Sequence, residues 1–319
     1  MSNDNINDVL VIGAGIMGAG IAQNFAESGV SARVVDISED ALQNCRGVIK
    51  ANLASFEKFD LLEESIETIF ERIQLLDSAD LKSHASECDF IVEAMPEVLE
   101  LKQTLFADLD DIDPNIIIAS NTSSMTISTL GEGMRTADRL IGLHYFNPAH
   151  IIPAVEVHAG KETTAPTIDT TMALMKRVGK QPVRVRKEVP GFIINRLTGA
   201  MEREIDYLLD EGVVTPEDLD TAVKASYGFR LACLGPMEAE DMIGLDTAAR
   251  ASSNLFPTLS NSAAPSPGIF EKVDRGELGI KSGKGWYDYP EDAKESLVAR
   301  NNTLLLQQLK LFKSRQGKD

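Results

Sequence analysis

The chain has 319 residues, enough for about two domains. It is 43% hydrophobic and 25% charged, as is usual for a globular protein, and its net charge is −18. This charge, with no basic run or tail, argues against nucleic acid or an anionic membrane as a partner. An anionic ligand must therefore be attracted by local basic residues.

The cysteines are Cys45, Cys88 and Cys233, without CxxC spacing, so neither a disulfide framework nor a zinc knuckle is expected. The N-terminal stretch MSNDNINDVL lacks the features of a signal peptide. No apolar run approaches the roughly 20 residues that span a bilayer. We therefore expect a reduced, cytoplasmic protein.

The first expected element is a buried strand over the apolar run 9–12. Gly13, Gly15 and Gly18 follow in GxGxxG spacing, and a helical pattern then continues to a stop at Gly29. Strand, glycine turn and helix in this order are typical of a dinucleotide-binding unit. The alternative is a set of glycines that serves only a turn.

A second strand over 32–35 ends at Asp36, 23 residues after Gly13. In such a unit the backbone from Gly13 to Gly18, including Ile16 and Met17, approaches a pyrophosphate at the helix N-terminus. Asp36 can accept hydrogen bonds from the adenosine ribose and would repel a 2′-phosphate. The pattern therefore predicts NAD rather than NADP as the cofactor.

Further strands are expected over 90–93, 116–120 and 140–144, separated by helical stretches. This alternation predicts a parallel sheet whose ligands gather beyond the carboxyl ends of the strands. Polar side chains fall at or just past those ends, and we expect them to share one site: Glu93, Asn121, Ser123 and His144.

The texture changes near Pro190, beyond which the pattern is helical with no further strand. Thr215 is the expected N-cap of one helix, followed by Pro216 in its first turn. The predicted fold is α/β: a Rossmann-type doubly wound sheet over residues 1–188, followed by an all-α domain over residues 189–319.

Several motifs in this order resemble the 3-hydroxyacyl-CoA dehydrogenase family. They are GAGIMGAGIAQ, VEAMPE, SNTSS, GLHYFNP, VEV, PGFIINR, GPMEAEDMIGLD and GIKSGKGWYDY. The resemblance covers nearly the whole chain. It implies NAD-linked oxidation of a 3-hydroxyl group to a ketone, in a homodimer formed through the helical domain.

Carried over residue by residue, the resemblance makes His144 the catalytic acid/base and Glu156 its partner. Ser123 and Asn195 become substrate-positioning groups. Histidine suits proton transfer near neutral pH, and a carboxylate on its far ring nitrogen fixes the tautomer and stabilises the imidazolium. The alternative for His144 is a core histidine bonded to the backbone.

Other positions match the NAD contacts of the family: Glu93, Lys102, Asn147 and Lys281. The alternative for Lys102 is a solvated lysine on a helix face. His150 and His158 have no counterpart in the chemistry, so we expect packing or surface roles, with the substrate pocket as an alternative for His150. No metal site is expected.

Two segments of the sequence bear on the class of substrate. The hairpin over 51–72 carries Lys58 followed by an acidic run, whereas acyl-CoA relatives usually carry several lysines there for CoA phosphates. The link YGFRLACLGPM is longer than in those enzymes. It resembles relatives that act on free hydroxy acids: gulonate 3-dehydrogenase (with its structural cousin lambda-crystallin), carnitine dehydrogenase and a dehydrogenase of pyridoxine breakdown. Arg230 in this link could hold a substrate carboxylate, or could form a salt bridge instead.

Three functions follow as hypotheses. The first is NAD-dependent oxidation of a small free 3-hydroxy carboxylic acid, and the second is oxidation of a true L-3-hydroxyacyl-CoA. The third is a catalytically silent crystallin-like or NAD-sensing protein, against which the complete set of His144, Glu156, Ser123 and Asn195 argues.

Overall fold

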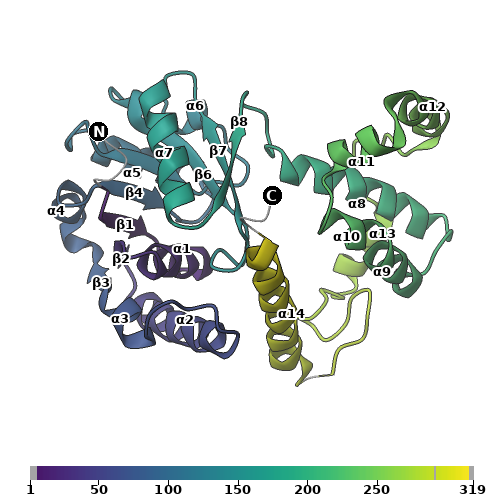
Figure 1. Cartoon of the computed structure of the whole chain (residues 1–319), viewed down its shortest axis with the longest axis horizontal. Helices are drawn as coiled ribbons and strands as arrows, with labels where there is room; N and C mark the ends of the chain where they lie inside the picture. The colour runs from purple at the N-terminus through teal and green to yellow at the C-terminus, as the bar shows by residue number, and fades with distance from the viewer. Residues whose placement is uncertain (1–5, 291, 316–319) are drawn as a thin grey trace. The chain divides into compact units, whose positions relative to one another are not determined.

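The computed structural model describes residues 6–290 and 292–315, and its strands form one sheet (Figure 1). The strands are β1 (Asp8–Ile12), β2 (Ser31–Asp36), β3 (Ile73–Asp77), β4 (Phe90–Glu93), β5 (Ile117–Ser120), β6 (Leu140–Tyr145), β7 (Ala154–Ala159) and β8 (Gln181–Val185). Their order is β3-β2-β1-β4-β5-β6-β7-β8. The first six strands run parallel, while β7 runs antiparallel to β6 and parallel to β8.

The five predicted strands are confirmed within one or two residues as β1, β2, β4, β5 and β6. Three strands were not predicted. The two edge strands, β3 and β8, carry polar or exposed positions, and β7 is interrupted by Glu156 and His158. None of the three therefore has the continuous apolar run that indicates a buried strand.

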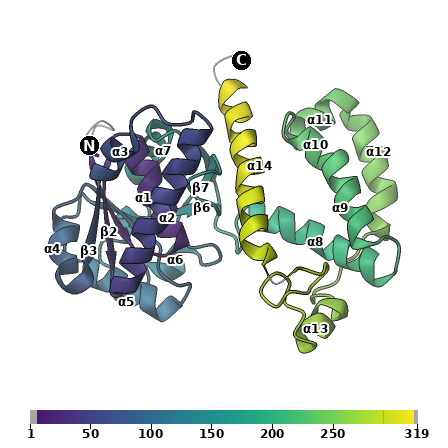
Figure 2. The ribbon, with the colours of Figure 1, turned by 90° about the horizontal axis from the view of Figure 1, so that it is seen from below.

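Helices of the first half cover both faces of the sheet. They are α1 (Ile16–Glu27), α2 (Glu39–Lys58), α3 (Ile66–Glu71), α4 (Leu81–Ser86), α5 (Leu99–Leu109), α6 (Ile127–Leu130) and α7 (Ala165–Arg177), with the 3₁₀ turns η2 (Ser78–Asp80) and η3 (Ala137–Arg139). Figure 2 shows α1 and α2 side by side, and Figure 1 shows α7 along β6 and β7.

The side chains of β1 alternate between the two faces of the sheet, and helices cover both faces. Val9 and Val11 belong to the core on the side of α1, α2 and α7, whereas Leu10 and Ile12 belong to the core on the side of α5. All four side chains are buried. The doubly wound α/β fold is therefore confirmed, because both faces of a central parallel strand must be apolar when helices cover both.

The rest of the chain is helical. Its helices are α8 (Ile194–Asp210), α9 (Pro216–Ala225), α10 (Tyr227–Leu231), α11 (Pro236–Ile243), α12 (Leu245–Leu255), α13 (Pro267–Asp274) and α14 (Ala293–Arg315), with the 3₁₀ turn η4 (Phe256–Thr258). The Thr215 side chain accepts a hydrogen bond from Asp218 N at 3.2 Å, which confirms the predicted N-cap of α9.

The chain divides into two compact units. The first unit is Met1–Asn195 with Arg300–Asp319, and the second is Arg196–Ala299. The last part of α14 belongs to the first unit because Leu306 and Leu309 are buried against Phe56 and Ile151. This division differs from a single cut between residues 188 and 189, so separate functional domains on either side of that cut stay a prediction.

Candidate active site

The polar residues at the strand ends lie where the parallel sheet predicts. Glu93 is the last residue of β4, and Asn121 and Ser123 directly follow β5. His144 is the penultimate residue of β6, and Asn121 Oδ1 accepts a hydrogen bond from Tyr145 N at 2.9 Å. The amide of Asn121 therefore joins the ends of β5 and β6, beside the proposed catalytic residues.

His144 and Glu156 form a buried pair across the two antiparallel strands. They are direct partners in the register of β6 and β7, and Nδ1 of His144 lies 2.8 Å from Oε2 of Glu156. The exposed fractions are 5% for His144 and 1% for Glu156. The contact rules out a backbone-bonded core histidine, and it leaves Nε2 as the ring nitrogen that can act on a substrate.

Glu156 is held as a carboxylate by the start of α8. Its Oε1 accepts hydrogen bonds from Ile193 N at 2.9 Å and Ile194 N at 3.0 Å. Burial alone would raise the pKa of Glu156, but the hydrogen bonds from His144, Ile194 and Ile193 outweigh it and hold the pKa below its usual value. The expected partner of this buried charge is thus confirmed.

Phe192 lies between the two histidines of this region. Its ring centroid is 5.5 Å from that of His144 and 3.8 Å from that of His158. The backbone of Phe192 has a φ of +50°, a strained value for a residue with a side chain, which indicates a turn fixed by its surroundings. That turn places the N–H groups of Ile193 and Ile194 where they donate hydrogen bonds to Glu156.

His158 is a packing residue, as expected. It is 1% exposed, and burial lowers its pKa to about 3, so the ring stays neutral at ordinary pH. The ring fills the space above Gly142, where an added Cβ would lie 2.0 Å from Cε1 of His158. Position 142 therefore requires glycine, because the His158 ring of β7 occupies the space that a Cβ would need.

Ser123 and Asn195 are brought together by a hydrogen bond from Asn195 Nδ2 to the Ser123 carbonyl oxygen, 3.1 Å long. Both residues are exposed. Since Ile193 and Ile194 bind Glu156, the same short segment links Ser123 to the His144–Glu156 pair.

Glu97 organises the loop that carries Ser123, and the sequence analysis did not identify it. Its Oε1 accepts hydrogen bonds from the Thr122 hydroxyl at 2.6 Å, from Ser123 N at 2.9 Å and from Ser124 N at 3.1 Å. Burial would raise the pKa of Glu97, but the Thr122 hydroxyl, Lys102 and further donors lower it to about 2. The only signal in the sequence was its place in the VEAMPE motif.

Lys102 and Glu93 form a buried ion pair, with Lys102 Nζ 2.6 Å from Glu93 Oε1. The exposed fractions are 1% and 0%, so a solvated Lys102 is wrong. Lys102 also lies 3.2 Å from Glu97 Oε2, and Ser120 donates to Glu93 at 2.6 Å. The pair therefore supports the loops after β4 and β5, while direct NAD contact by either residue stays a prediction.

The glycine turn leaves room for a dinucleotide. A Cβ at Gly15 would meet no protein atom within 4 Å, whereas a Cβ at Gly18 would lie 1.8 Å from Gly13 O. Gly15 caps α1 without a side-chain hydrogen bond, and the neighbouring Ile16 is 71% exposed. Asp36 lies beside this turn, accepting from Ala14 N at 2.8 Å. Free N–H groups beside open space suit a pyrophosphate.

Comparison with known proteins agrees with this geometry. Residues 8–189 match the 3-hydroxyacyl-CoA dehydrogenase NAD-binding domain, and residues 191–289 match the C-terminal domain of the same enzymes. The chain belongs to the 3-hydroxyacyl-CoA dehydrogenase family. It is an NAD-dependent oxidoreductase with a Rossmann-type domain.

Two relatives illustrate the range of this dehydrogenase family. A 5-formyl-3-hydroxy-2-methylpyridine 4-carboxylate 5-dehydrogenase of Mesorhizobium japonicum is 33% identical over 98% of this chain and 100% of its own length. A probable 3-hydroxybutyryl-CoA dehydrogenase of Bacillus subtilis is 36% identical over 90% of this chain and 98% of its own length.

Solved structures of the family show the same range. The crystal structure of a 5-formyl-3-hydroxy-2-methylpyridine 4-carboxylic acid 5-dehydrogenase, described as an NAD⁺-dependent dismutase, covers 98% of this chain and 100% of its own, at 33% identity, with a TM-score of 0.90. That of an (S)-3-hydroxybutyryl-CoA dehydrogenase from Ralstonia eutropha covers 90% and 100%, at 36% identity, with a TM-score of 0.73.

The three remaining predicted site residues of this dehydrogenase, Asn147, Arg230 and Lys281, are exposed. Asn147 is exposed in the loop after β6. Arg230 and Lys281 are exposed in the second unit, and Arg230 makes no ion pair with any residue that the structure describes. Their roles stay predictions.

His150 is half-buried and packs against Phe56, with ring centroids 5.7 Å apart. Within residues 6–290 and 292–315, no group of three or more His, Cys, Asp or Glu side chains is arranged to hold a metal ion. No helix in this part of the chain combines the length and the apolar character needed to cross a membrane.

Proposed function

We propose that the protein oxidises the 3-hydroxyl of a small free 3-hydroxy carboxylic acid, with His144 as the general base. The buried His144–Glu156 pair at the end of a sheet strand is the observation that carries the proposal. Family membership does not establish the substrate of this protein, because relatives named for CoA thioesters and for free acids share this fold.

The reaction removes a hydride and a proton from one carbinol. NAD, when bound, supplies the hydride acceptor. As the C–H bond breaks with its electron pair, the hydroxyl proton passes to Nε2 of His144, and the remaining electrons form the C=O bond. Glu156 accepts the Nδ1 proton in a hydrogen bond, which keeps Nε2 free as a base and stabilises the imidazolium that forms.

Ser123 and Asn195 are the proposed positioning groups for the reacting oxygen. Both are neutral hydrogen bonders, so they hold a hydroxyl or a ketone without competing for the proton. The hydrogen bond between them and the Glu97 contacts to the same loop support this assignment.

For NAD we propose the turn from Gly13 to Gly18, with Ile16 and Met17, around the pyrophosphate, and Asp36 on the adenosine ribose. Glu93, Lys102, Asn147 and Lys281 are proposed contacts from the family resemblance. Asp36→Ala should weaken the preference for NAD over NADP, measured as the ratio of kcat/KM for the two cofactors.

Two features support a free acid over a CoA thioester. The hairpin over 51–72 has few basic residues, and its end is covered by α14: Leu306 and Leu309 pack on Phe56, and Lys310 lies 3.0 Å from Asp60. In addition, a relative that matches 98% of this chain is named for a pyridine carboxylate, a free acid.

Arg230 is the proposed anchor of the substrate carboxylate. It has the planar geometry for a bidentate contact. The test compares NADH formation from a panel of free 3-hydroxy acids, such as 3-hydroxybutyrate, with that from 3-hydroxybutyryl-CoA. We expect turnover of a free acid, with KM raised at least about tenfold by Arg230→Ala.

Oxidation of an L-3-hydroxyacyl-CoA is the second candidate, favoured by the 36% identity to the Bacillus subtilis relative. Efficient turnover of the thioester that Arg230→Ala leaves unchanged would select this candidate and reject the free acid. The matched control is Arg250→Ala, an exposed arginine of α12.

We further propose a homodimer formed through the helical residues 196–299. Among the described residues of this unit, no hydrophobic side chain is buried, and large ones such as Phe229, Met242 and Phe256 are 66% exposed or more. An apolar surface of this kind favours a protein partner, and we expect a second copy. Light scattering should give the mass of a dimer; a monomer at micromolar concentration contradicts the proposal.

A cytoplasmic location is proposed from the three free cysteines, since Cys45 and Cys88 are buried thiols without a disulfide. Fractionation of the producing cells with an antibody to the protein tests this location.

A further inference from the structure

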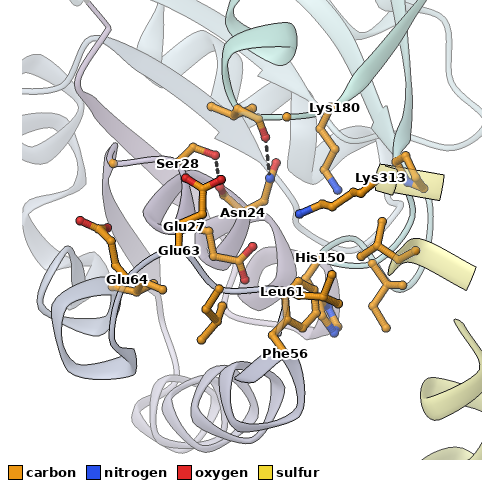
Figure 3. Close-up of a pocket in the computed structure, with 18 of the residues that line it drawn as sticks. Asn24, Glu27, Ser28, Phe56, Leu61, Glu63, Glu64, His150, Lys180 and Lys313 are labelled. Carbon is orange, nitrogen blue, oxygen red and sulfur yellow. Dashed lines mark hydrogen bonds between the residues drawn. The ribbon is translucent and has the colours of Figure 1, made fainter. Parts of the chain in front are cut away.

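The first unit contains a cavity that none of the proposed catalytic residues lines. Its volume is about 560 Å³, and its walls come from the end of α1, the loop between β6 and β7, the loop between α7 and β8, and α14 (Figure 3). The matched family domains end at residue 289, so the α14 wall is a feature of the segment that follows them.

One end of the cavity gathers two ammonium groups. Lys180 is 4% exposed, and its Nζ donates to Ala149 O at 2.6 Å and Ile152 O at 2.9 Å. An ammonium has three N–H donors, so one donor of Lys180 has no acceptor among the described residues. Lys313 enters from α14, and Figure 3 shows Lys180 and Lys313 extending into the same part of the cavity, near Asn24.

The carboxylate of Glu27 interacts electrostatically with both of these cations, and Glu63 lines the same cavity. Burial raises the pKa of Glu27 to about 7 and lowers the pKa of Lys180 to about 8. Both shifts mean that the charged forms are poorly solvated in the cavity. Lys180 is thus a buried cation that a bound anion would help to stabilise, whereas Lys313 is exposed.

The walls of the cavity carry further charged residues. Arg72 pairs with Glu64, Arg177 donates to Ile6 O, and Glu63 is exposed. Four cations and three carboxylates line the cavity, although the whole chain carries a charge of −18. The cavity is therefore richer in basic side chains than the chain as a whole.

The opposite wall is apolar. Leu61, Ile151, Leu309 and Phe312 line it, together with Phe56, on which the His150 ring packs. Burial lowers the pKa of His150 to about 4, so this ring is neutral and adds no charge. The wall suits a compact hydrocarbon or an aromatic ring, as in other small-molecule pockets.

We propose that this cavity binds a small organic monocarboxylate, with its carboxylate between Lys180 and Lys313 and its apolar body against Phe56, Ile151 and Phe312. The carboxylate takes the remaining donor of Lys180 and pairs with the ammonium group of Lys313. Because Lys180 holds two carbonyl groups of the loop between β6 and β7, occupancy bears directly on the loop that joins His144 to Glu156.

The test measures binding, independently of catalysis and of the proposed substrate. Hexanoate and its neutral analogue hexanamide are titrated calorimetrically into the full-length protein saturated with NADH. Lys313→Met removes the ammonium and keeps the apolar stem. Lys310→Met is the matched control, since Lys310 lies on the same helix, pairs with Asp60 and does not line the cavity.

We expect hexanoate to bind at millimolar concentration and hexanamide not to bind. Lys313→Met should weaken hexanoate binding at least about tenfold, as expected for removal of one charged partner. Lys310→Met should leave it unchanged. Glu27→Gln should tighten it, because a carboxylate that competes for both ammonium groups is removed while an acceptor for Gln23 remains.

The proposal is overturned by an absence of hexanoate binding to the wild type, by equal binding of hexanamide, or by binding that Lys313→Met does not change. An equal loss in Lys310→Met would also overturn it, since the effect would then come from the general charge of α14. The opposite signs expected for Lys313→Met and Glu27→Gln separate a site effect from partial unfolding, which would weaken binding in both.

Discussion

His144 Nδ1 lies 2.8 Å from Oε2 of Glu156, and the two residues are direct cross-strand partners. This contact depends on the reversal of chain direction between β6 and β7, the only antiparallel pairing among the named strands of the sheet. A carboxylate that is buried, ionised and bonded to one ring nitrogen sets the tautomer of the histidine. The other ring nitrogen is then available for proton transfer.

Replacing the base should remove catalysis and leave the cofactor site intact. His144→Ala is expected to lower kcat by about 10² or more, because proton transfer by a positioned side chain contributes about that much. NADH affinity, measured by fluorescence titration, should change little. A variant that loses NADH binding instead would show that His144 supports the fold of the cofactor site.

Neutralising its partner should act through the orientation of His144. Glu156→Gln retains the size of the side chain but removes the charge that stabilises the imidazolium, and we expect kcat to fall by about 10² to 10⁴. Steady-state NADH formation at saturating substrate measures this change in kcat. Glu162→Gln, an exposed carboxylate outside the site, is the control and should behave as the wild type.

Glu97 is expected to position Ser123 rather than to act on the substrate. Glu97→Gln weakens three hydrogen bonds to the loop, so kcat/KM should fall about tenfold or more, given the strength of hydrogen bonds to charged groups. Glu100→Gln, exposed on α5, should have no effect. An unchanged kcat/KM in Glu97→Gln would show that Ser123 keeps its position without this carboxylate.

The same carboxylate gives a pH dependence of stability. The pKa of Glu97 is about 2 in the folded protein, against an ordinary value of 4.5. Between pH 2 and pH 4.5 the folded state therefore binds fewer protons than the unfolded state. Its contribution to the free energy of unfolding is present above pH 4.5 and is lost as the pH falls toward 2. Urea unfolding measured across this pH range should show a smaller decrease in the free energy of unfolding for Glu97→Gln than for the wild type.

Substitution of Gly15 should weaken NAD binding, whereas substitution of Gly18 should destabilise the fold. Gly15→Ala adds a Cβ to space that is free of protein, so the melting temperature should hold while NAD affinity falls about tenfold or more. Gly18→Ala places a Cβ 1.8 Å from Gly13 O, so the fold itself should be destabilised. Gly47→Ala in the open face of α2 is the control and should stabilise by about 0.5–1 kcal/mol.

Much of the cofactor site was predictable because its signals are local. A strand, a turn and a helix each leave a pattern within a dozen residues, and the glycine spacing around Gly13 adds steric requirements that few other folds impose. The edge strand β8 could not be predicted in this way, since QPVRV contains a proline and exposed polar positions.

The role of Lys102 shows the limit of such patterns. Its place on α5 is compatible with a solvated lysine, and only the packed structure places it at 1% exposure between Glu93 and Glu97. Glu97 likewise gains its importance from residues that follow a different strand, 25 to 27 positions further along the chain.

The sequence by itself determined the fold class, the dinucleotide turn and the identity of the proposed base, because each depends on spacing within one element or on residue type. Tertiary structure decided which residues complete the site. Glu156 reaches His144 through strand pairing, Ile193 and Ile194 reach Glu156 through the turn at Phe192, and Glu97 reaches Ser123 across two loops. Long-range contacts of this kind follow from how the strands are ordered in the sheet, which no local pattern records.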